Sequence, residues 1–348
     1  MIYIYQTSSI SPQPFPLALE TLNTNIATLD NTMMVVEPQY DGIPTNILRR
    51  MGKAVRIGVG AALSIINEQP IIEGIIIGTA NGSMEDSIKF LNQIVDYQEG
   101  MLTPTNFVQS TPNAVAAQLA LLLANKFYNA THVHRGLAFE NALLDAMMLC
   151  TENPQSQFLL GGLDEISTYN YNIESLGGWY KSEAISPNQL YQSTTSGTIA
   201  GEGASMFLVG NNSANAIAKV TAIQIIHSAD INEVSDSLTQ FLISNEIDPN
   251  SIDTLILGEN GDFRLQNFYD HISLRFTNSH IIRYKHLCGE YATATAFALS
   301  IASLIIQSNQ VPLHFFKQKR TSESIENILI YNTFKGLQHS FIYVQKAS

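Results

Sequence analysis

The chain has 348 residues, of which 45% are apolar and only 14% are charged, and its net charge is −12. The length allows one large domain or two mid-sized ones, and a composition this apolar is not that of a disordered chain. The chain has 30 acidic and 18 basic residues. This acidic balance argues against a nucleic-acid-binding or anionic-membrane-binding surface, because both require clustered Lys and Arg.

The two cysteines, Cys150 and Cys288, do not make a disulfide framework, so we expect a reducing, cytoplasmic location. The start of the chain lacks the basic and apolar regions of a signal peptide. The longest apolar stretch, residues 292–306, is interrupted by Thr and Ser and is too short for a membrane span. It is better interpreted as a buried helix.

Apolar patterns typical of strands and helices alternate along the first part of the chain, as in α/β proteins. Thr111 is predicted to cap a helix with Pro112 at its first position. The Ser-, Thr-, Tyr- and Asn-rich segment 169–201 predicts long loops. We expect strands at 1–6, 71–78, 157–161 and 204–209, the last two paired, and helices at 50–67, 83–97, 111–125 and 136–150.

The second part repeats this order of elements, although residue identity between the parts is negligible. A layered fold of two similar β/α halves explains the repeat, with the two most apolar helices, 136–150 and 289–307, in the middle layer. In this part we expect strands at 218–226, 252–258, 327–331 and 341–344, and helices at 231–245 and 289–307.

Eight local signatures are spread over nearly the whole chain. They are IYQTSSISPQ, LRRMGKAVRIGVGAAL, IIIGTANGSMEDS, FVQSTPNAVAAQLA, FLLGGLDEIS, AGEGASMFLV, KHLCGEYATATAFALSIASLI and YNTFKGLQHSFI. These segments resemble those of the β-ketoacyl-acyl carrier protein synthases, the condensing enzymes of the thiolase fold, and they occur in the same order and at similar spacing as in that family.

The resemblance implies a thiolase-like α/β fold, in which two similar halves pack as five layers (αβαβα) around two buried central helices. We expect a single domain over residues 1–348, with an N-terminal half at 1–212 and a C-terminal half at 213–348. No cofactor is implied, and no phosphate-binding glycine loop is present. His132 and His134 lack an evident third ligand, so no metal is expected.

Members of the family carry a cysteine nucleophile at the start of the first central helix, where the helix N-terminus favours the thiolate. Counting back from the Gly-Gly strand places Gly136 at that position. Cys150 cannot replace it, because it lies 14 residues along the same helix, or about 21 Å away. We expect Cys150 to be a buried apolar residue.

The two family histidines are also replaced. By resemblance, Asn260 stands at the first position and Glu290 at the second, whereas the family's lysine is retained as Lys285. A carboxylate at position 290 should repel a malonyl group. Cys288 is a possible pocket residue, although a packed loop residue is the simpler interpretation. Phe334 stands in a shortened form of the loop whose phenylalanine gates the family's acyl pocket.

The loss of all three catalytic residues suggests a chain length factor, the inactive subunit that pairs with an active ketosynthase and sets product length in fatty acid, polyketide or aryl-polyene biosynthesis. The ketosynthase partner, or a second copy of this chain, would complete a dimer. Because carrier proteins are acidic, an acyl carrier protein should dock on the partner.

Two alternatives remain open at this point. One is an active 3-oxoacyl-acyl carrier protein synthase, acyltransferase or decarboxylase that uses Cys288, or Lys285 with Glu290. The other is a homodimer that holds an acyl carrier protein without chemistry.

Overall fold

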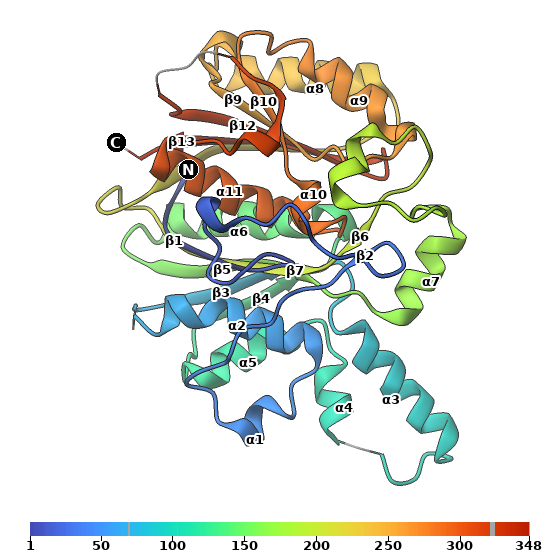
Figure 1. The fold of residues 1–348 in the computed structure, drawn as a ribbon. Coiled ribbons are helices and arrows are strands. Elements are labelled where there is room, and N and C mark those ends of the chain that lie inside the picture. The colour runs from blue at the N-terminus through green and yellow to red at the C-terminus, as the bar shows by residue number, and fades with distance from the viewer. Residues whose placement is uncertain (69, 103, 321–323, 348) are drawn as a thin grey trace.

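The computed structural model describes residues 1–68, 70–102, 104–320 and 324–347. Its strands and helices alternate along the chain (Figure 1). The strands are β1 (Ile2–Ile10), β2 (Thr32–Met33), β3 (Gly74–Gly78), β4 (Tyr128–His132), β5 (Gln157–Asp164), β6 (Ala200–Gly201), β7 (Gly203–Gly210), β8 (Ala218–His227), β9 (Thr254–Leu257), β10 (His280–Arg283), β11 (Phe316–Gln318), β12 (Asn327–Phe334) and β13 (Gln338–Lys346). The helices are α1 (Thr45–Leu48), α2 (Lys53–Ile66), α3 (Met84–Asp96), α4 (Pro104–Gln109), α5 (Ala114–Leu122), α6 (Ala138–Glu152), α7 (Thr168–Leu176), α8 (Ile231–Ser244), α9 (Gln266–Ser273), α10 (Lys285–Cys288) and α11 (Ala294–Ser308).

The strand order repeats between the two parts of the chain. Strands from residues 2–210 follow the order β4-β3-β5-β7-β1, and those from residues 218–346 follow β10-β9-β12-β13-β8. In each part the first three strands of this order are parallel to one another, and the remaining neighbours are antiparallel. The predicted boundary between residues 212 and 213 falls between β7 and β8, and the division into two halves stays a prediction.

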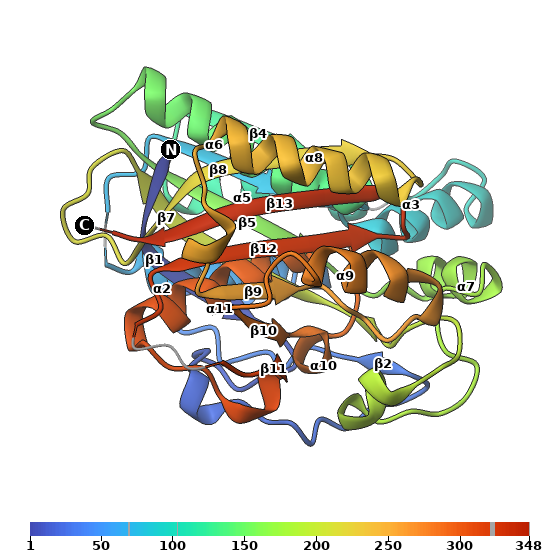
Figure 2. The same cartoon turned by 90° about the horizontal axis from the view of Figure 1, so that it is seen from above.

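The two sets of strands join where β1 pairs with β8, at Ile2↔Val220 and the two following residue pairs. Around this junction the sheet folds over α6 and α11, while α2 and α5 cover one outer side (Figure 1). Helices α8 and α9 lie along the other outer side, above β12 and β13 (Figure 2). This arrangement confirms the predicted five-layer αβαβα fold.

The two central helices differ in how deeply they are buried. Residues 294–303 of α11 are all buried, because strands of both parts and α6 pack around this helix. Helix α6 buries one face only, and Leu144 and Met148 are exposed on the other. Cys150 is fully buried, as predicted. No helix in the described residues is long and apolar enough to span a membrane.

The helix predicted at 289–307 begins only at Ala294. Gly289 has a φ of 71°, a left-handed conformation that suits glycine, and it ends the short helix α10. A Cβ at Gly289 would lie 2.6 Å from the Cα of Gly201. The close approach of two backbones therefore interrupts a segment whose apolar pattern looks continuous.

The predicted cap at Thr111 is wrong. The Thr111 hydroxyl donates to the carbonyl of Val108, so it completes the turn after α4, and α5 begins at Ala114 with Asn113 at its N-cap position. The segment predicted as loops also contains regular structure, namely α7, β6 and the 3-10 helix Pro187–Gln192.

A buried carboxyl group, Glu140, lies in the first turn of α6 and accepts a hydrogen bond from the Ser340 hydroxyl of β13, at 2.9 Å. Its side chain has no exposed surface. Burial raises the pKa of Glu140 to about 7, and hydrogen bonds oppose that rise. The folded chain therefore holds this proton more tightly than the unfolded chain does.

We expect Glu140→Gln to stabilise the protein at pH 8 but to change stability little at pH 4.5. The folded pKa is raised, so the contribution of Glu140 to stability is fully present below its unfolded pKa and is lost as pH rises through about 7. The expected gain at pH 8 is on the order of 3 kcal/mol. Urea unfolding of both proteins at each pH measures it, and an equal difference at both pH values contradicts the assignment.

Candidate functional site

A cavity of about 270 Å³ lies where the strands of both parts end. Its wall includes Asn81 after β3, Asp164 at the end of β5, Asn260 after β9 and Phe334 at the end of β12. In open α/β sheets, ligands bind at the carboxyl ends of parallel strands. The cavity is therefore the candidate site, and α7 contributes to its outer side.

Phe334 packs directly against Gly136, in the 3-10 helix Arg135–Leu137 that precedes α6. A Cβ added to Gly136 would lie 2.2 Å from the Cβ of Phe334, far inside van der Waals contact. The Gly136 amide donates to the side-chain oxygen of Gln338, at 3.0 Å. Neither the space nor the amide at the start of this helix is free for a reacting group.

Asn260, Glu290 and Lys285 form one buried chain of contacts. The Asn260 amide donates to Oε2 of Glu290 at 2.7 Å, and the Lys285 ammonium donates to Oε1 at 2.6 Å. Lys285 has no exposed surface, while Asn260 and Glu290 line the cavity. Both carboxylate oxygens of Glu290 are therefore held by donors from within the protein.

The backbone of Glu290 is held as firmly as its side chain. Its N–H donates to the carbonyl of Ile199, and its carbonyl accepts from Gly201. Gly201 has no room for a side chain, because a Cβ there would lie 2.1 Å from the carbonyl oxygen of Cys288. The Gly-Glu-Gly segment singled out in the sequence thus fixes Glu290 through close backbone contact.

Cys288 does not line the cavity, although its neighbour Glu290 does. The thiol is fully buried in the apolar core and donates weakly to the carbonyl of Gly289. Burial raises the pKa of Cys288 well above its ordinary value, so the thiolate needed for nucleophilic attack is disfavoured. Lys285 also lies behind the cavity wall.

Two carboxyl groups of the wall, Asp164 and Glu165, were not singled out from the sequence. Oδ1 of Asp164 accepts from Ala80 N at 2.8 Å, and Oδ2 accepts from Thr293 N at 3.1 Å. Burial raises the pKa of Asp164 to about 6, against the effect of these hydrogen bonds. Asp164 thereby joins the turn after β3 to the start of α11.

Glu165 has the same role toward two outer helices. It accepts from Ala54 N near the start of α2 and from Glu85 N near the start of α3. Carboxylates are favourable at helix N-termini, where backbone N–H groups lack partners. Burial raises the pKa of Glu165 to about 7. The sequence pattern that could have indicated these two residues is an Asp-Glu pair at the end of the buried strand β5.

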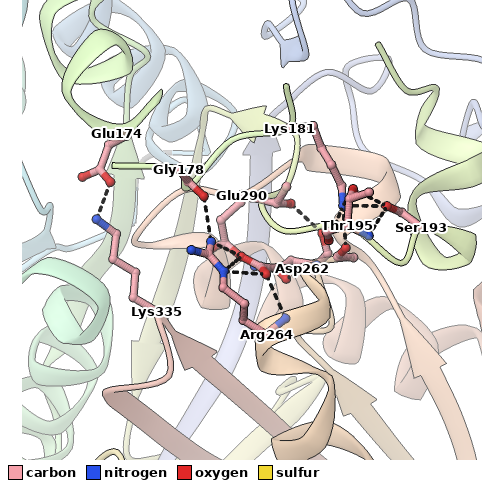
Figure 3. A network of polar contacts seen from close by, with 12 residues as sticks. Glu174, Gly178, Lys181, Ser193, Thr195, Asp262, Arg264, Glu290 and Lys335 are labelled. Carbon is pink, nitrogen blue, oxygen red and sulfur yellow. Dashed lines mark hydrogen bonds and ion pairs between the residues drawn. The ribbon is translucent and has the colours of Figure 1, made fainter. Parts of the chain in front are cut away.

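The mouth of the cavity is covered by α7 and the segment that follows it (Figure 3). Lys335 pairs with Glu174 of α7, and Arg264 donates to the carbonyl of Gly178 at 2.8 Å. Both cations also lie over the Trp179 ring, Arg264 at 4.4 Å and Lys335 at 5.0 Å from its centre. Cation–π contacts, the ion pair and the hydrogen bond thus hold α7 and the segment after it to the turn after β12, through Lys335, and to the 3-10 helix Phe263–Leu265, through Arg264.

The described residues contain no group of three or more His, Cys, Asp or Glu side chains that could hold a metal ion. The residues lining the cavity include no cysteine. What the wall presents is an acidic and aromatic surface, with Glu290 and Asn260 at its inner end.

Residues 26–176 match the family sequence model described as the N-terminal domain of β-ketoacyl synthases. A search of curated proteins finds no match. The family match covers less than half of the chain, and it agrees with the layered fold described above.

Solved structures cover the whole chain at low sequence identity. The ishigamide ketosynthase/chain length factor matches at a TM-score of 0.77 and 12% identity, over 100% of this chain and 99% of the other. A ketosynthase in complex with its chain length factor from Xenorhabdus doucetiae matches at a TM-score of 0.77 and 14% identity, over 99% of this chain and 98% of the other. A β-ketoacyl synthase from Burkholderia phymatum STM815 matches at a TM-score of 0.75 and 14% identity, over 100% of this chain and 99% of the other. The chain therefore has the thiolase-like fold of these ketosynthase structures, and residues 26–176 resemble the N-terminal domain of β-ketoacyl synthases, in agreement with the resemblance seen in the sequence.

We expect Gly136→Ala to destabilise the protein by about 1–3 kcal/mol, because the new methyl group overpacks against Phe334. In the double variant Gly136→Ala/Phe334→Gly this penalty should largely disappear relative to Phe334→Gly alone, because glycine removes the Cβ of Phe334 as well as its ring. Urea unfolding of the four proteins gives the coupling free energy. If the free-energy changes of the two single variants simply add in the double variant, the contact between Gly136 and Phe334 is contradicted.

We expect Glu290→Gln to cost about 3 kcal/mol or more, since it leaves the Lys285 ammonium buried without a counter-charge. The double variant Lys285→Met/Glu290→Gln should lose less than the sum of the single changes. The exposed pair Lys346–Glu326 is the control, where Glu326→Gln should cost less than about 1 kcal/mol. Thermal and urea unfolding measure both, and equal losses at the two sites contradict a special role for the buried pair.

Proposed function

We propose that this chain is a chain length factor-type subunit that pairs with an active ketosynthase and does not itself condense acyl groups. The observation that carries the proposal is the contact of Phe334 with Gly136. By family resemblance, Gly136 stands where condensing enzymes have their cysteine nucleophile, and the Phe334 ring takes the space that a thiol at this position needs.

The inner end of the cavity supports the same interpretation. By resemblance, Asn260 and Glu290 replace two histidines that act on the malonyl group. Both oxygens of the Glu290 carboxylate are already engaged by Asn260 and Lys285, so these side chains are not free to bind a malonyl group as the two histidines do. The fully buried Cys288 thiol is no substitute nucleophile, since it lies outside the cavity wall. The partner is proposed to supply the cysteine and both histidines.

The face proposed for pairing is the edge at β4. This strand stands last in the strand order and pairs with β3 on one side. Helices α5 and α6 pack against it and expose Leu121, Leu144 and Met148. An unpaired edge flanked by exposed apolar side chains is suited to strand pairing with another subunit. Two similar structures contain, by their descriptions, a ketosynthase together with a chain length factor.

In the proposed pair this subunit lines the interface cavity that receives the growing chain, in fatty acid, polyketide or aryl-polyene-type biosynthesis. The acyl carrier protein docks on the ketosynthase, since a chain with a net charge of −12 repels an acidic carrier protein.

Co-expression with an active Cys-His-His ketosynthase from the same organism, followed by gel filtration, tests the proposal. We expect a 1:1 complex that condenses acyl groups only through the ketosynthase cysteine. Leu144→Asp/Met148→Asp should abolish co-elution, because two charges would be buried without partners at the interface. Leu313→Asp, at an equally apolar and 76% exposed position in another part of the chain, should leave the complex intact.

Two results contradict the proposal. One is a stable homodimer that never binds the ketosynthase, and the other is condensation or acyl labelling by this chain alone. Labelling that is lost in Cys288→Ala would point instead to an active enzyme with a different nucleophile.

A further inference from the structure

The ammonium group of Lys181 lies in a cage of four oxygen atoms (Figure 3). It contacts Ser193 Oγ at 2.6 Å, Thr195 O at 2.9 Å, Thr195 Oγ1 at 3.0 Å and Gly261 O at 2.9 Å. Only 5% of the residue is exposed. An ammonium has three N–H donors, so it cannot direct a separate N–H at each of four oxygens. The four oxygens instead surround the ammonium as ligands surround a spherical cation.

All four oxygens are neutral: two are backbone carbonyls and two are hydroxyls. Lys181 therefore differs from the buried Lys285, whose ammonium is paired directly with a carboxylate. Oxygen ligands of this kind are those that hard cations take in proteins. A negative charge stands one step further away, because the Thr195 hydroxyl donates to Glu183.

The cage joins the segment 181–198 to the turn that carries Asn260. Lys181 N donates to the carbonyl of Thr198, and the Thr198 hydroxyl donates to the carbonyl of Asn260 at 2.6 Å. The next residue, Gly261, supplies one of the cage carbonyls and has a φ of 77°. The ammonium thus holds the backbone directly after Asn260, and the Thr198 hydroxyl holds the carbonyl of Asn260 itself.

We propose that this cage is a monovalent-cation site whose occupant is the tethered ammonium of Lys181, and that Lys181 acts as a positioning residue for Asn260. The inference concerns this chain alone and does not depend on the pairing with a ketosynthase. It predicts that the cage accepts a free monovalent cation once the ammonium is removed.

Thermal unfolding of Lys181→Ala in potassium chloride and in choline chloride, at equal ionic strength, tests this proposal. Equal ionic strength keeps the general screening of charges the same, and choline is too large for the cage. We expect the variant to have a lower Tm than the wild-type chain in choline, and to recover much of that loss in potassium. The wild-type Tm should be the same in both salts.

Lys181→Arg is the matched control. It keeps the charge, but its planar guanidinium has a different shape from the compact ammonium and fills the space of a free ion. Its Tm should fall and should not respond to potassium.

The cation site is overturned if the Tm of Lys181→Ala is lowered equally in potassium and in choline. It is also overturned if Lys181→Ala has the same Tm as the wild-type chain in choline. If Lys181→Ala does not fold in choline, the yield of refolded protein in the two salts replaces Tm as the measurement. Refolding in potassium alone supports the proposal, and failure in both salts overturns it.

Discussion

The carboxylate of Asp164, at the end of β5, holds together the two parts of the chain at the cavity. One oxygen accepts from the turn after β3, and the other accepts from the N–H and hydroxyl of Thr293 at the start of α11. Burying a carboxylate costs several kcal/mol unless donors replace its water. The raised pKa of Asp164, about 6, indicates that burial outweighs even these donors. The Asp164 carboxylate therefore fixes the start of α11, a helix whose residues 294–303 are all buried.

The remaining contacts of the cavity follow from this fixed frame. With α11 in place, Glu290 is confined between its backbone bridge to Ala200 and the ammonium of Lys285. At the opposite side, the turn after β12 brings Phe334 onto Gly136 and places Lys335 against α7. Each of these contacts fills the cavity from inside the chain.

Sequence patterns predicted the long elements well, because burial imposes a clear period on helices such as α2 and α8 and on strands such as β5 and β7. They did not predict β4 or β10. The predicted strands β3 and β9 are equally short, but every residue in them is buried and nearly all are apolar or glycine. Strand β4 has no buried residue and β10 begins and ends with His280 and Arg283, so neither has an apolar run to indicate a strand. The family resemblance located Asn260, Glu290 and Lys285, and the structure brings these three together. The contact of Gly136 with Phe334 joins residues far apart in the chain, so no local pattern could indicate it.

The low charge content of the sequence has two physical origins in this structure. Helix α11 is apolar because protein surrounds it on every side, and this accounts for part of the low charge without any partner. Helix α6 occupies the matching place in a part with the same strand order, yet it leaves Leu144 and Met148 in contact with water. The repeat therefore makes α6 the element whose apolar surface exceeds what its own chain can cover. The proposed ketosynthase partner would cover that excess, and the edge strand β4 beside it offers backbone groups for the same contact.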